Sequence, residues 1–363
     1  MNSSWDHWAT RLSTEIASAG RWRVQITKED LGKVANFATN DYLGLSQHDQ
    51  VRSAAASAID RWGTGSGSSR LVSGTLSVHQ QLEATIASWK RSEEAIVFSS
   101  GFLTNLGVMT TFASKEVEVF SDELNHASII DGCRLAKGEV HIYRHCDMDH
   151  LRSLMEQHAN RKKRSLVVSD LVFSMDGDVA PIYELMEICD HFNALLVVDE
   201  AHSLFQEVDY EIPTLRVGTL SKTLGSLGGF VAGPATYINL LRNLARSYIF
   251  TTALSPSDAA AALEAVSLLR SEEGKALIAK LRGNVDLLRE EWPSPIIPVL
   301  IGSEVHALSM AKALLERSML VPAIRPPSVP IGTSRLRISL SAIHTVEEVF
   351  ALKSSLTELG LLF

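Results

Sequence analysis

The middle of the chain alternates short apolar runs with helical stretches. Runs rich in Val, Ile, Leu and Phe predict seven strands, at 95–99, 116–121, 139–144, 165–173, 194–199, 215–220 and 228–233. Several of these runs are continuous rather than alternating, which is typical of strands that are covered on both faces. The pattern therefore predicts an α/β sheet with helices on both sides.

The segments between these strands indicate the strand directions. Parallel neighbours need a crossover of about a dozen residues, and the segments at 101–113, 126–137, 147–160 and 181–193 are long enough. The segment SKTLGSL, which precedes the seventh strand, is too short for such a crossover. We therefore expect a mostly parallel sheet of seven strands in which only the last strand is antiparallel.

Beyond about residue 245 the pattern predicts a smaller α/β region. Its expected elements are helices at 256–292, a helix at 304–318 and strands at 295–301, 320–324 and 335–340. The prolines of RPPSVP (325–330) fix φ and remove hydrogen-bond donors, so this stretch should be an extended loop. The predicted organisation is an N-terminal segment (1–40), a large domain (41–245) and a small C-terminal domain (246–363).

Composition narrows the class of protein. The 34 basic and 42 acidic side chains give a net charge of −8, which argues against a dominant surface for nucleic acid or anionic membrane. The cysteines Cys133, Cys146 and Cys189 are odd in number and lack C-x-x-C spacing, so they support neither a disulfide framework nor a zinc ribbon. Without an apolar signal segment or a run of about 20 apolar residues, we expect a cytoplasmic protein with no membrane span.

Two motifs permit other interpretations. The glycines of WGTGSGSSRLVSG (62–74) allow close approach to a ligand, but a dinucleotide fingerprint would follow a strand and open a helix. Residues 49–61, which precede the motif, have a helical apolar face instead, and a simple structural turn is the other alternative. The sequence DEAH (199–202) occurs in ATP-driven helicases, but the chain has no G-x-x-x-x-G-K-[ST] phosphate loop upstream.

After these alternatives, the strongest candidates for reactive residues are an aspartate and a lysine. Asp199 follows the apolar run LLVV, and Lys222 lies in a Ser/Thr/Gly-rich turn farther along the same predicted sheet. Ligands of parallel sheets bind outside the carboxyl ends of the strands. Pyridoxal phosphate needs a lysine amine that bonds to it and a carboxylate that keeps its pyridine nitrogen protonated. The pair therefore predicts a pyridoxal-phosphate site.

The phosphate of that cofactor would need its own donors. Candidates are Ser174, Thr219, Ser221 and the backbone of Gly101 and Phe102, which open a predicted helix. Each residue alone has a plain structural interpretation, because lysines on surface turns are usually solvated and histidines are often structural. The prediction therefore depends on the convergence of these groups at one sheet edge.

Several motifs together resemble a known family. They are NDYLGLS (40–46), GTGSGSSRLVSG (63–74), SSGFLTN (99–105), HAS (126–128), VFSMDGD (172–178), DEAH (199–202), TLSK (219–222) and AIRPPSVPIGTSRLRISLSAIHT (323–345). From about residue 20 to its end, the chain resembles the α-oxoamine synthases. These enzymes have the type I fold of pyridoxal-phosphate-dependent aminotransferases and join an amino acid to an acyl thioester with loss of carbon dioxide.

The resemblance implies a role for each matching residue. Lys222 would bond to the cofactor, Asp199 would pair with its pyridine nitrogen, His202 would bond its phenolate oxygen and His126 would stack on its ring. Thr251 and Thr252, in FTTALSP, would complete the phosphate site from the neighbouring subunit of a homodimer. Arg337 and Asn40 would hold the amino-acid carboxylate, and Arg21 would contact the thioester side.

Within the family, GSGSSRLVSG and AIRPPSVPIGTSRLR are similar to the biotin-pathway member, which implies L-alanine and pimeloyl-CoA or its acyl-carrier-protein equivalent as substrates. The alternatives are a member that uses glycine or serine with another thioester, and a binding or regulatory relative without turnover. One departure bears on the acyl pocket. Only sixteen residues separate His202 from Thr219, where the family usually has a longer glycine-rich stretch.

Overall fold

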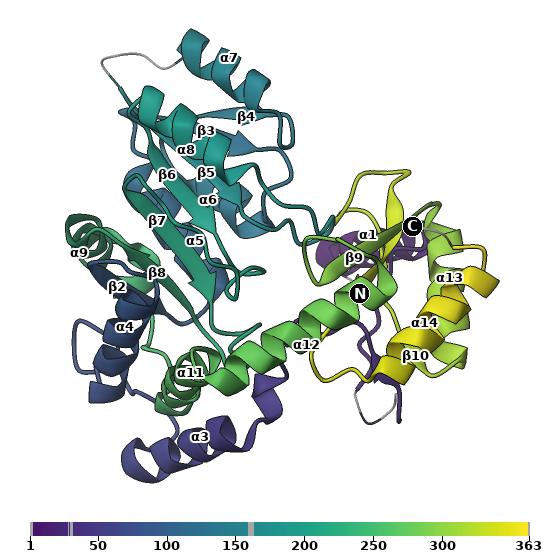
Figure 1. The fold of residues 1–363 in the computed structure, drawn as a ribbon. Coiled ribbons are helices and arrows are strands. Elements are labelled where there is room, and N and C mark those ends of the chain that lie inside the picture. Colours follow the sequence, from purple (N-terminus) through teal and green to yellow (C-terminus); the bar gives the residue numbers. More distant parts are fainter. Residues whose placement is uncertain (1–2, 28, 30–31, 159–162, 362–363) are drawn as a thin grey trace. The chain divides into compact units, whose positions relative to one another are not determined.

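The computed structural model describes residues 3–27, 29, 32–158 and 163–361 (Figure 1). The chain divides into two compact units. The larger unit contains Asn40–Ser174 and Asp178–Leu281, and the smaller unit contains Met1–Thr39, Met175–Gly177 and Arg282–Phe363.

This division differs from the predicted domains at two places. Helix α11 (Pro256–Leu269) packs against α3 (Asp49–Trp62) and α4 (Ser77–Trp89), so the larger unit extends past residue 245. The N-terminal residues, expected as a separate segment, contribute β1 (Ala35–Asn36), which pairs in parallel with β10 (Met319–Leu320). Backbone pairing with residues near the other end of the sequence therefore places the N-terminal segment in the smaller unit.

A seven-stranded sheet forms the centre of the larger unit. Its strands are β2 (Glu94–Phe98), β3 (Val117–Asp122), β4 (Glu139–Tyr143), β5 (Arg164–Asp170), β6 (Leu195–Asp199), β7 (Thr214–Thr219) and β8 (Gly229–Gly233). Their order is β2-β8-β7-β6-β5-β3-β4. Strand β8 is antiparallel to both of its neighbours, and the other pairings are parallel. The predicted sheet, with one reversed strand, is confirmed.

Helices cover both faces of this sheet. Val168 and Val197 face a core shared with α5 (Gly101–Phe112), α6 (Ala127–Leu135), α9 (Ala235–Leu244) and α10 (Arg246–Ile249). Their neighbours Val167 and Val198 face the opposite core, shared with α7 (Met148–His158) and α8 (Ile182–His191). Successive residues of a strand point to opposite faces of the sheet. Because both faces of β5 and β6 are covered, the residues on each face must be apolar. This arrangement explains the continuous apolar runs of the sequence.

The crossovers agree with the expected helical segments as far as the structure describes them. Helices α5, α6, α7 and α8 fall within those segments, and residues 159–160 of the expected 147–160 crossover lie outside the described residues. A short 3-10 helix, η1 (Leu45–Gln47), precedes α3, and α12 (Glu272–Leu288) passes from one unit into the other.

The smaller unit contains a three-stranded antiparallel sheet in the order β11-β12-β9. Its elements are α1 (Ser4–Ser18), β9 (Ile296–Gly302), α13 (Glu304–Glu316), β11 (Ala323–Ile324), β12 (Ser334–Ser339) and α14 (Val346–Glu358). The single strand expected at 320–324 is wrong, because Pro322 interrupts it and the two sides pair with different strands, β10 with β1 and β11 with β12. As expected, residues 325–330 form a loop.

No helix among the described residues is both long enough and apolar enough to cross a lipid bilayer.

Candidate active site

A pocket of about 170 Å³ lies at the carboxyl edge of the large sheet. Asp170, Asp199 and Thr219 are the last residues of β5, β6 and β7, and all three line it. Parallel strands end at the same edge, which is why residues distant in sequence meet here. The pocket brings together eight of the predicted site residues: Gly101, Phe102, His126, Asp199, His202, Thr219, Ser221 and Lys222.

Asp199 is a buried carboxylate held by uncharged donors. The Asn105 amide donates to its Oδ2 at 2.7 Å, and the backbone N–H of Ala201 donates to its Oδ1 at 2.9 Å. Its side chain nevertheless borders the pocket that contains Lys222. A carboxylate buried in this way favours a cationic partner in the pocket.

His126 caps the N-terminus of α6 and lines the same pocket. Its Nδ1 lies 2.7 Å from Ser128 Oγ and accepts the backbone N–H of Ser128 at 3.3 Å. Burial lowers the pKa of His126; the charge of Asp199 opposes this shift, and the Lys222 ammonium adds to it. The lowered pKa favours the neutral imidazole of His126 near neutral pH.

Asp170 is the strand neighbour of Asp199, and sequence reasoning missed it. The two residues are paired in register between β5 and β6, and Asp170 Oδ2 accepts the backbone N–H of His126 at 2.8 Å. Burial and then the charge of Asp199 raise the pKa of Asp170 well above its ordinary value, which favours the protonated acid. The signal that singled out Asp199, a carboxylate after an apolar run, is also present in SLVVSD (165–170).

His202 is oriented by a tyrosine that sequence reasoning also missed. Tyr42 is completely buried, and its Oη lies 2.6 Å from His202 Nδ1. The same hydroxyl donates to Asn40 Oδ1 at 3.3 Å. The contact fixes the His202 ring and directs its other nitrogen away from Tyr42, so NDYLGLS reaches the site through Tyr42.

The start of α5 forms one end of the pocket through Gly101 and Phe102. A Cβ on Gly101 would lie 3.2 Å from Thr219 Oγ1, and one on Gly229 would lie 2.7 Å from Gly101 Cα. Glycine at both positions therefore lets the helix begin directly against β7 and β8. Backbone N–H groups of a helix N-terminus attract anions, and Thr219 and Ser221, whose hydroxyls lie 2.8 Å apart, add polar groups at this end.

The other predicted site residues do not line this pocket. Ser174 follows the end of β5, Thr251 and Thr252 lie between α10 and α11, and Asn40 contacts Tyr42. Arg337 and Arg21 belong to the smaller unit. There, Arg337 is buried in β12, and Arg21 donates to both carboxylate oxygens of Glu304, at 2.9 and 3.3 Å.

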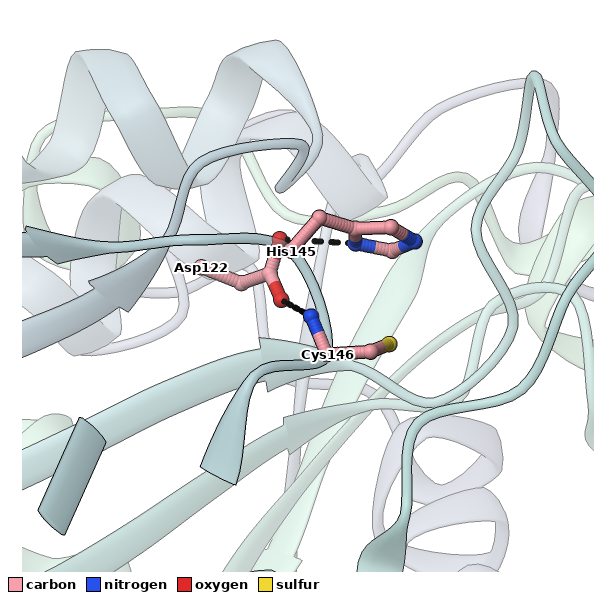
Figure 2. A group of neighbouring side chains, drawn as sticks. All are labelled: Asp122, His145 and Cys146. Carbon is pink, nitrogen blue, oxygen red and sulfur yellow. Dashed lines mark hydrogen bonds and ion pairs between the residues drawn. The ribbon is translucent and has the colours of Figure 1, made fainter. Parts of the chain in front are cut away.

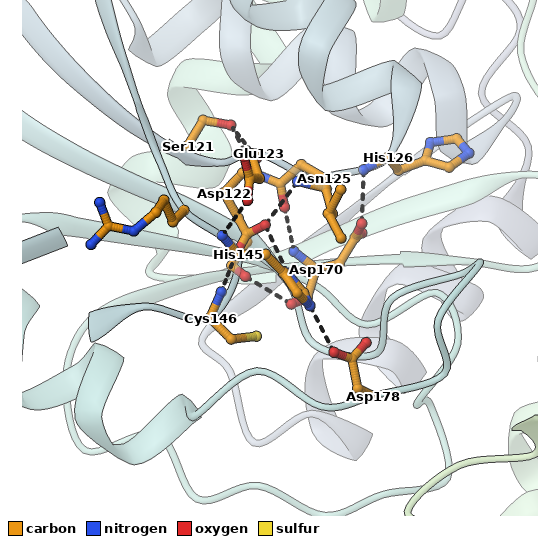
Figure 3. Close-up of polar contacts among 12 residues, drawn as sticks. Ser121, Asp122, Glu123, Asn125, His126, His145, Cys146, Asp170 and Asp178 are labelled. Atoms are coloured by element: carbon orange, nitrogen blue, oxygen red, sulfur yellow. Dashed lines mark hydrogen bonds and ion pairs between the residues drawn. The ribbon is translucent and has the colours of Figure 1, made fainter. Parts of the chain in front are cut away.

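A second polar cluster lies beside the pocket residues, and Figure 2 shows its three central members, Asp122, His145 and Cys146. These residue types can bind metals, but the His145 nitrogens contact carboxylates, Asp122 at 3.1 Å and Asp178 at 2.7 Å (Figure 3). Burial opposes the charge of His145, but these hydrogen bonds outweigh burial and raise its pKa to about 12. The described geometry is that of an ion-pair network centred on a protonated histidine.

The short loop after His202 is anchored by a buried ion cluster. Glu200 accepts from Lys90 at 2.6 Å, from Arg216 at 2.7 Å and from the Tyr210 hydroxyl at 3.0 Å. Burial opposes the ionisation of Glu200, but the two cations outweigh it and lower its pKa. The sequence offered no signal for Lys90, which lies far from DEAH along the chain.

The donors in the pocket fit pyridoxal phosphate. The buried Asp199 carboxylate suits a protonated ring nitrogen, Lys222 offers an amine, and the close packing of Gly101 leaves a helix N-terminus accessible to a phosphate group. Neutral His126 and tyrosine-bound His202 lie on the same pocket. Among the described residues that line this pocket, Lys222 is the one lysine, and Asp170 and Asp199 are the two acids. Burial and the charge of Asp199 raise the pKa of Asp170, which makes Asp199 the better partner for a cation.

Comparison with known proteins identifies the class. The chain belongs to the aminotransferase class I and II family, whose sequence profile matches residues 32–356. It is 45% identical to 8-amino-7-oxononanoate synthase of Anaeromyxobacter sp. (strain K) over 87% of this chain and 84% of that protein.

Solved structures give the same class. Serine palmitoyltransferase from S. paucimobilis, with bound PLP-Myriocin Aldimine, has a TM-score of 0.87 and 27% identity, covering 99% of this chain and 100% of that chain. For 8-amino-7-oxononanoate synthase from Francisella tularensis the TM-score is 0.75 and the identity 27%, covering 90% of this chain and 98% of that chain. The resemblance to α-oxoamine synthases and the type I fold are thereby confirmed.

Proposed function

We propose that the protein is an 8-amino-7-oxononanoate synthase. It would condense L-alanine with pimeloyl-CoA or pimeloyl acyl-carrier protein, releasing carbon dioxide. The observation that carries this proposal is the meeting of Lys222 and Asp199 in one pocket, in a chain 45% identical to a relative of that name. A non-catalytic relative would have no chemical need for both residues.

The cofactor would be pyridoxal phosphate, which when bound supplies an electron sink for the bonds broken at the α-carbon of the amino acid. Lys222 would bond to it, then act as the base that removes the α-proton once the amino acid has displaced it. Asp199 would hold the proton on the ring nitrogen. His202 would hydrogen-bond the phenolate oxygen, and His126 would cover one face of the ring.

The remaining contacts follow from charge and hydrogen-bonding capacity. The amides of Gly101 and Phe102, with Thr219, Ser221 and Ser174, would bind the phosphate. Arg337, with its planar guanidinium, would bind the amino-acid carboxylate in a bidentate manner, assisted by Asn40. Arg21 would contact the thioester side, for which its pairing with Glu304 must be exchanged.

We also propose a homodimer in the cytoplasm. Thr251 and Thr252 do not line the pocket of their own chain, which supports a role for them at the phosphate site of a neighbouring subunit. Light scattering should therefore give the mass of a dimer, and a fully active monomer would contradict this part of the proposal.

The main competing function is an α-oxoamine synthase that uses glycine or serine. Serine palmitoyltransferase structures, with TM-scores up to 0.87, favour it, and the short loop after His202 leaves the acyl partner open. The higher identity to 8-amino-7-oxononanoate synthases favours alanine and a pimeloyl thioester.

A kinetic panel separates these possibilities. The purified holoenzyme is assayed with alanine, glycine or serine against pimeloyl, acetyl, succinyl and palmitoyl thioesters, and kcat/KM values are compared. Alanine with a pimeloyl thioester should be fastest, and Arg337→Lys should raise the KM for alanine roughly tenfold or more while leaving cofactor binding unchanged. A faster glycine or serine reaction would refute the proposed substrates while retaining the enzyme class.

A further inference from the structure

A continuous chain of hydrogen bonds connects the two pocket residues that would contact opposite parts of the cofactor ring. It runs from His126 through Ser128 and Asn105 to Asp199. His126 Nδ1 lies 2.7 Å from Ser128 Oγ, Asn105 Nδ2 lies 2.9 Å from the same hydroxyl, and it lies 2.7 Å from Asp199 Oδ2. Asn105 and Ser128 are almost completely buried, at 2% and 0% exposure.

The donors in this chain have one consistent direction. An amide nitrogen only donates, so both hydrogens of Asn105 Nδ2 are used, one toward Ser128 and one toward Asp199. The Ser128 hydroxyl, having accepted from Asn105, donates its own hydrogen to His126 Nδ1. That nitrogen also accepts the Ser128 backbone N–H. His126 is then the neutral tautomer with its hydrogen on Nε2, in agreement with its lowered pKa.

Asp170, the neighbouring acid, offers a comparison for the hydrogen bonds that Asp199 receives. Asp170 and Asp199 are register partners on adjacent strands and are buried to 4% and 6% exposure. Asp170 accepts the backbone N–H of His126 on Oδ2, and burial, followed by the charge of Asp199, raises its pKa well above the ordinary range. Asp199 receives an N–H on each carboxylate oxygen, so the direction of its carboxylate is fixed from both sides.

We propose that Asn105, held by Ser128, is a positioning residue that aims the Asp199 carboxylate at the pyridine nitrogen of the cofactor. This inference rests on the proposed cofactor. Without the Asn105 donor the Asp199 carboxylate loses one of the two hydrogen bonds that fix its direction, so its hydrogen bond to the protonated ring nitrogen weakens and the ring gives up its proton more readily. The ring then loses the positive charge that makes it an electron sink.

The test uses ¹⁵N-labelled pyridoxal phosphate, whose nitrogen chemical shift reports ring protonation, and a fluorescence titration of cofactor affinity. Asn105→Leu removes both N–H donors at similar volume. It should move the ¹⁵N shift toward the unprotonated value and weaken cofactor binding about tenfold or more, as expected for losing a hydrogen bond to a charged group. Ser128→Ala should produce a smaller shift in the same direction.

Asn284→Leu is the matched control. Asn284 is an equally buried amide that donates to Ser341 O at 3.0 Å and His344 O at 3.1 Å in the smaller unit. The Asn284→Leu variant should lose thermal stability, but the ¹⁵N chemical shift of the bound cofactor should not change. Thermal unfolding of each variant reports the structural loss separately from the spectroscopic one.

The outcomes separate this inference from the proposed function. If the unmodified protein binds no pyridoxal phosphate, the proposed function fails. If it binds the cofactor with a protonated ring and Asn105→Leu keeps both that ¹⁵N shift and the affinity, the positioning role is overturned. Should Asn105→Leu not fold, an unchanged ¹⁵N shift in folded Ser128→Ala overturns it instead.

Discussion

Two consecutive acids, Asp199 and Glu200, are both buried at the end of β6 but have opposite surroundings. Asp199 borders the pocket and is bound by the uncharged amides of Asn105 and Ala201. Glu200 is 1% exposed and is bound by Lys90 and Arg216. The charge of Glu200 is therefore neutralised within the protein, whereas that of Asp199 remains available to a cationic ligand. Burial alone therefore does not mark a functional acid; the charge of the groups that bind it does.

The largest effect should come from removing the cation on the pocket side. Lys222→Ala leaves Asp199 in place but removes the amine that would bond to the cofactor and move the α-proton. Turnover should fall by roughly 10³-fold or more, measured as kcat of the purified holoenzyme. Borohydride reduction and peptide mapping of the unmodified protein should place the pyridoxyl group on Lys222, and labelling of another lysine would refute the site.

Asp199→Asn tests the functional half of the comparison. An amide cannot hold the proton of the ring nitrogen, so kcat should fall roughly 10²- to 10³-fold. The melting temperature without cofactor should fall by a few degrees, because the new amide nitrogen must face one of the two N–H donors that bind the carboxylate. Near-normal turnover would mean that another residue serves the ring nitrogen.

Glu200→Gln tests the structural half. It leaves Lys90 and Arg216 without their buried counter-ion, so the free energy of unfolding should fall by about 3 to 5 kcal/mol. Chemical denaturation measures this change. The cofactor affinity of the folded fraction should stay within a few-fold of the original; if affinity collapsed while stability held, the contrast between the two acids would be wrong.

The smallest effect is a pH dependence from His126. Its pKa is lowered in the folded protein, so protonation below the ordinary value near 6.5 favours the unfolded state. Its contribution is complete above pH 6.5 and is lost as the pH falls from 6.5 toward the folded pKa, by at most about 1.4 kcal/mol per pH unit. His126→Gln should flatten that part of the stability profile, measured by urea unfolding between pH 7.5 and 5.5.

Sequence reasoning predicted the large sheet because its strands are buried on both faces, which leaves a continuous apolar pattern. It also singled out Lys222 and Asp199, because an acid after an apolar run and a lysine in a polar turn of the same sheet are the two groups that pyridoxal phosphate needs. It did not single out Lys90 or Asn105, since the contact of each with its acid joins residues about a hundred positions apart. Such contacts depend on tertiary packing, and local patterns do not encode them.

The strand order also has a consequence for folding. Strand β8 lies between β2 and β7, and it pairs with β2 across more than a hundred intervening residues. During synthesis, β2 and β7 therefore expose unpaired edges until residue 233 has left the ribosome. Pairings of such large sequence separation close slowly because of the loop entropy they cost, and open edges favour aggregation. The interval before β8 inserts is thus the stage at which a chaperone would protect the nascent chain most.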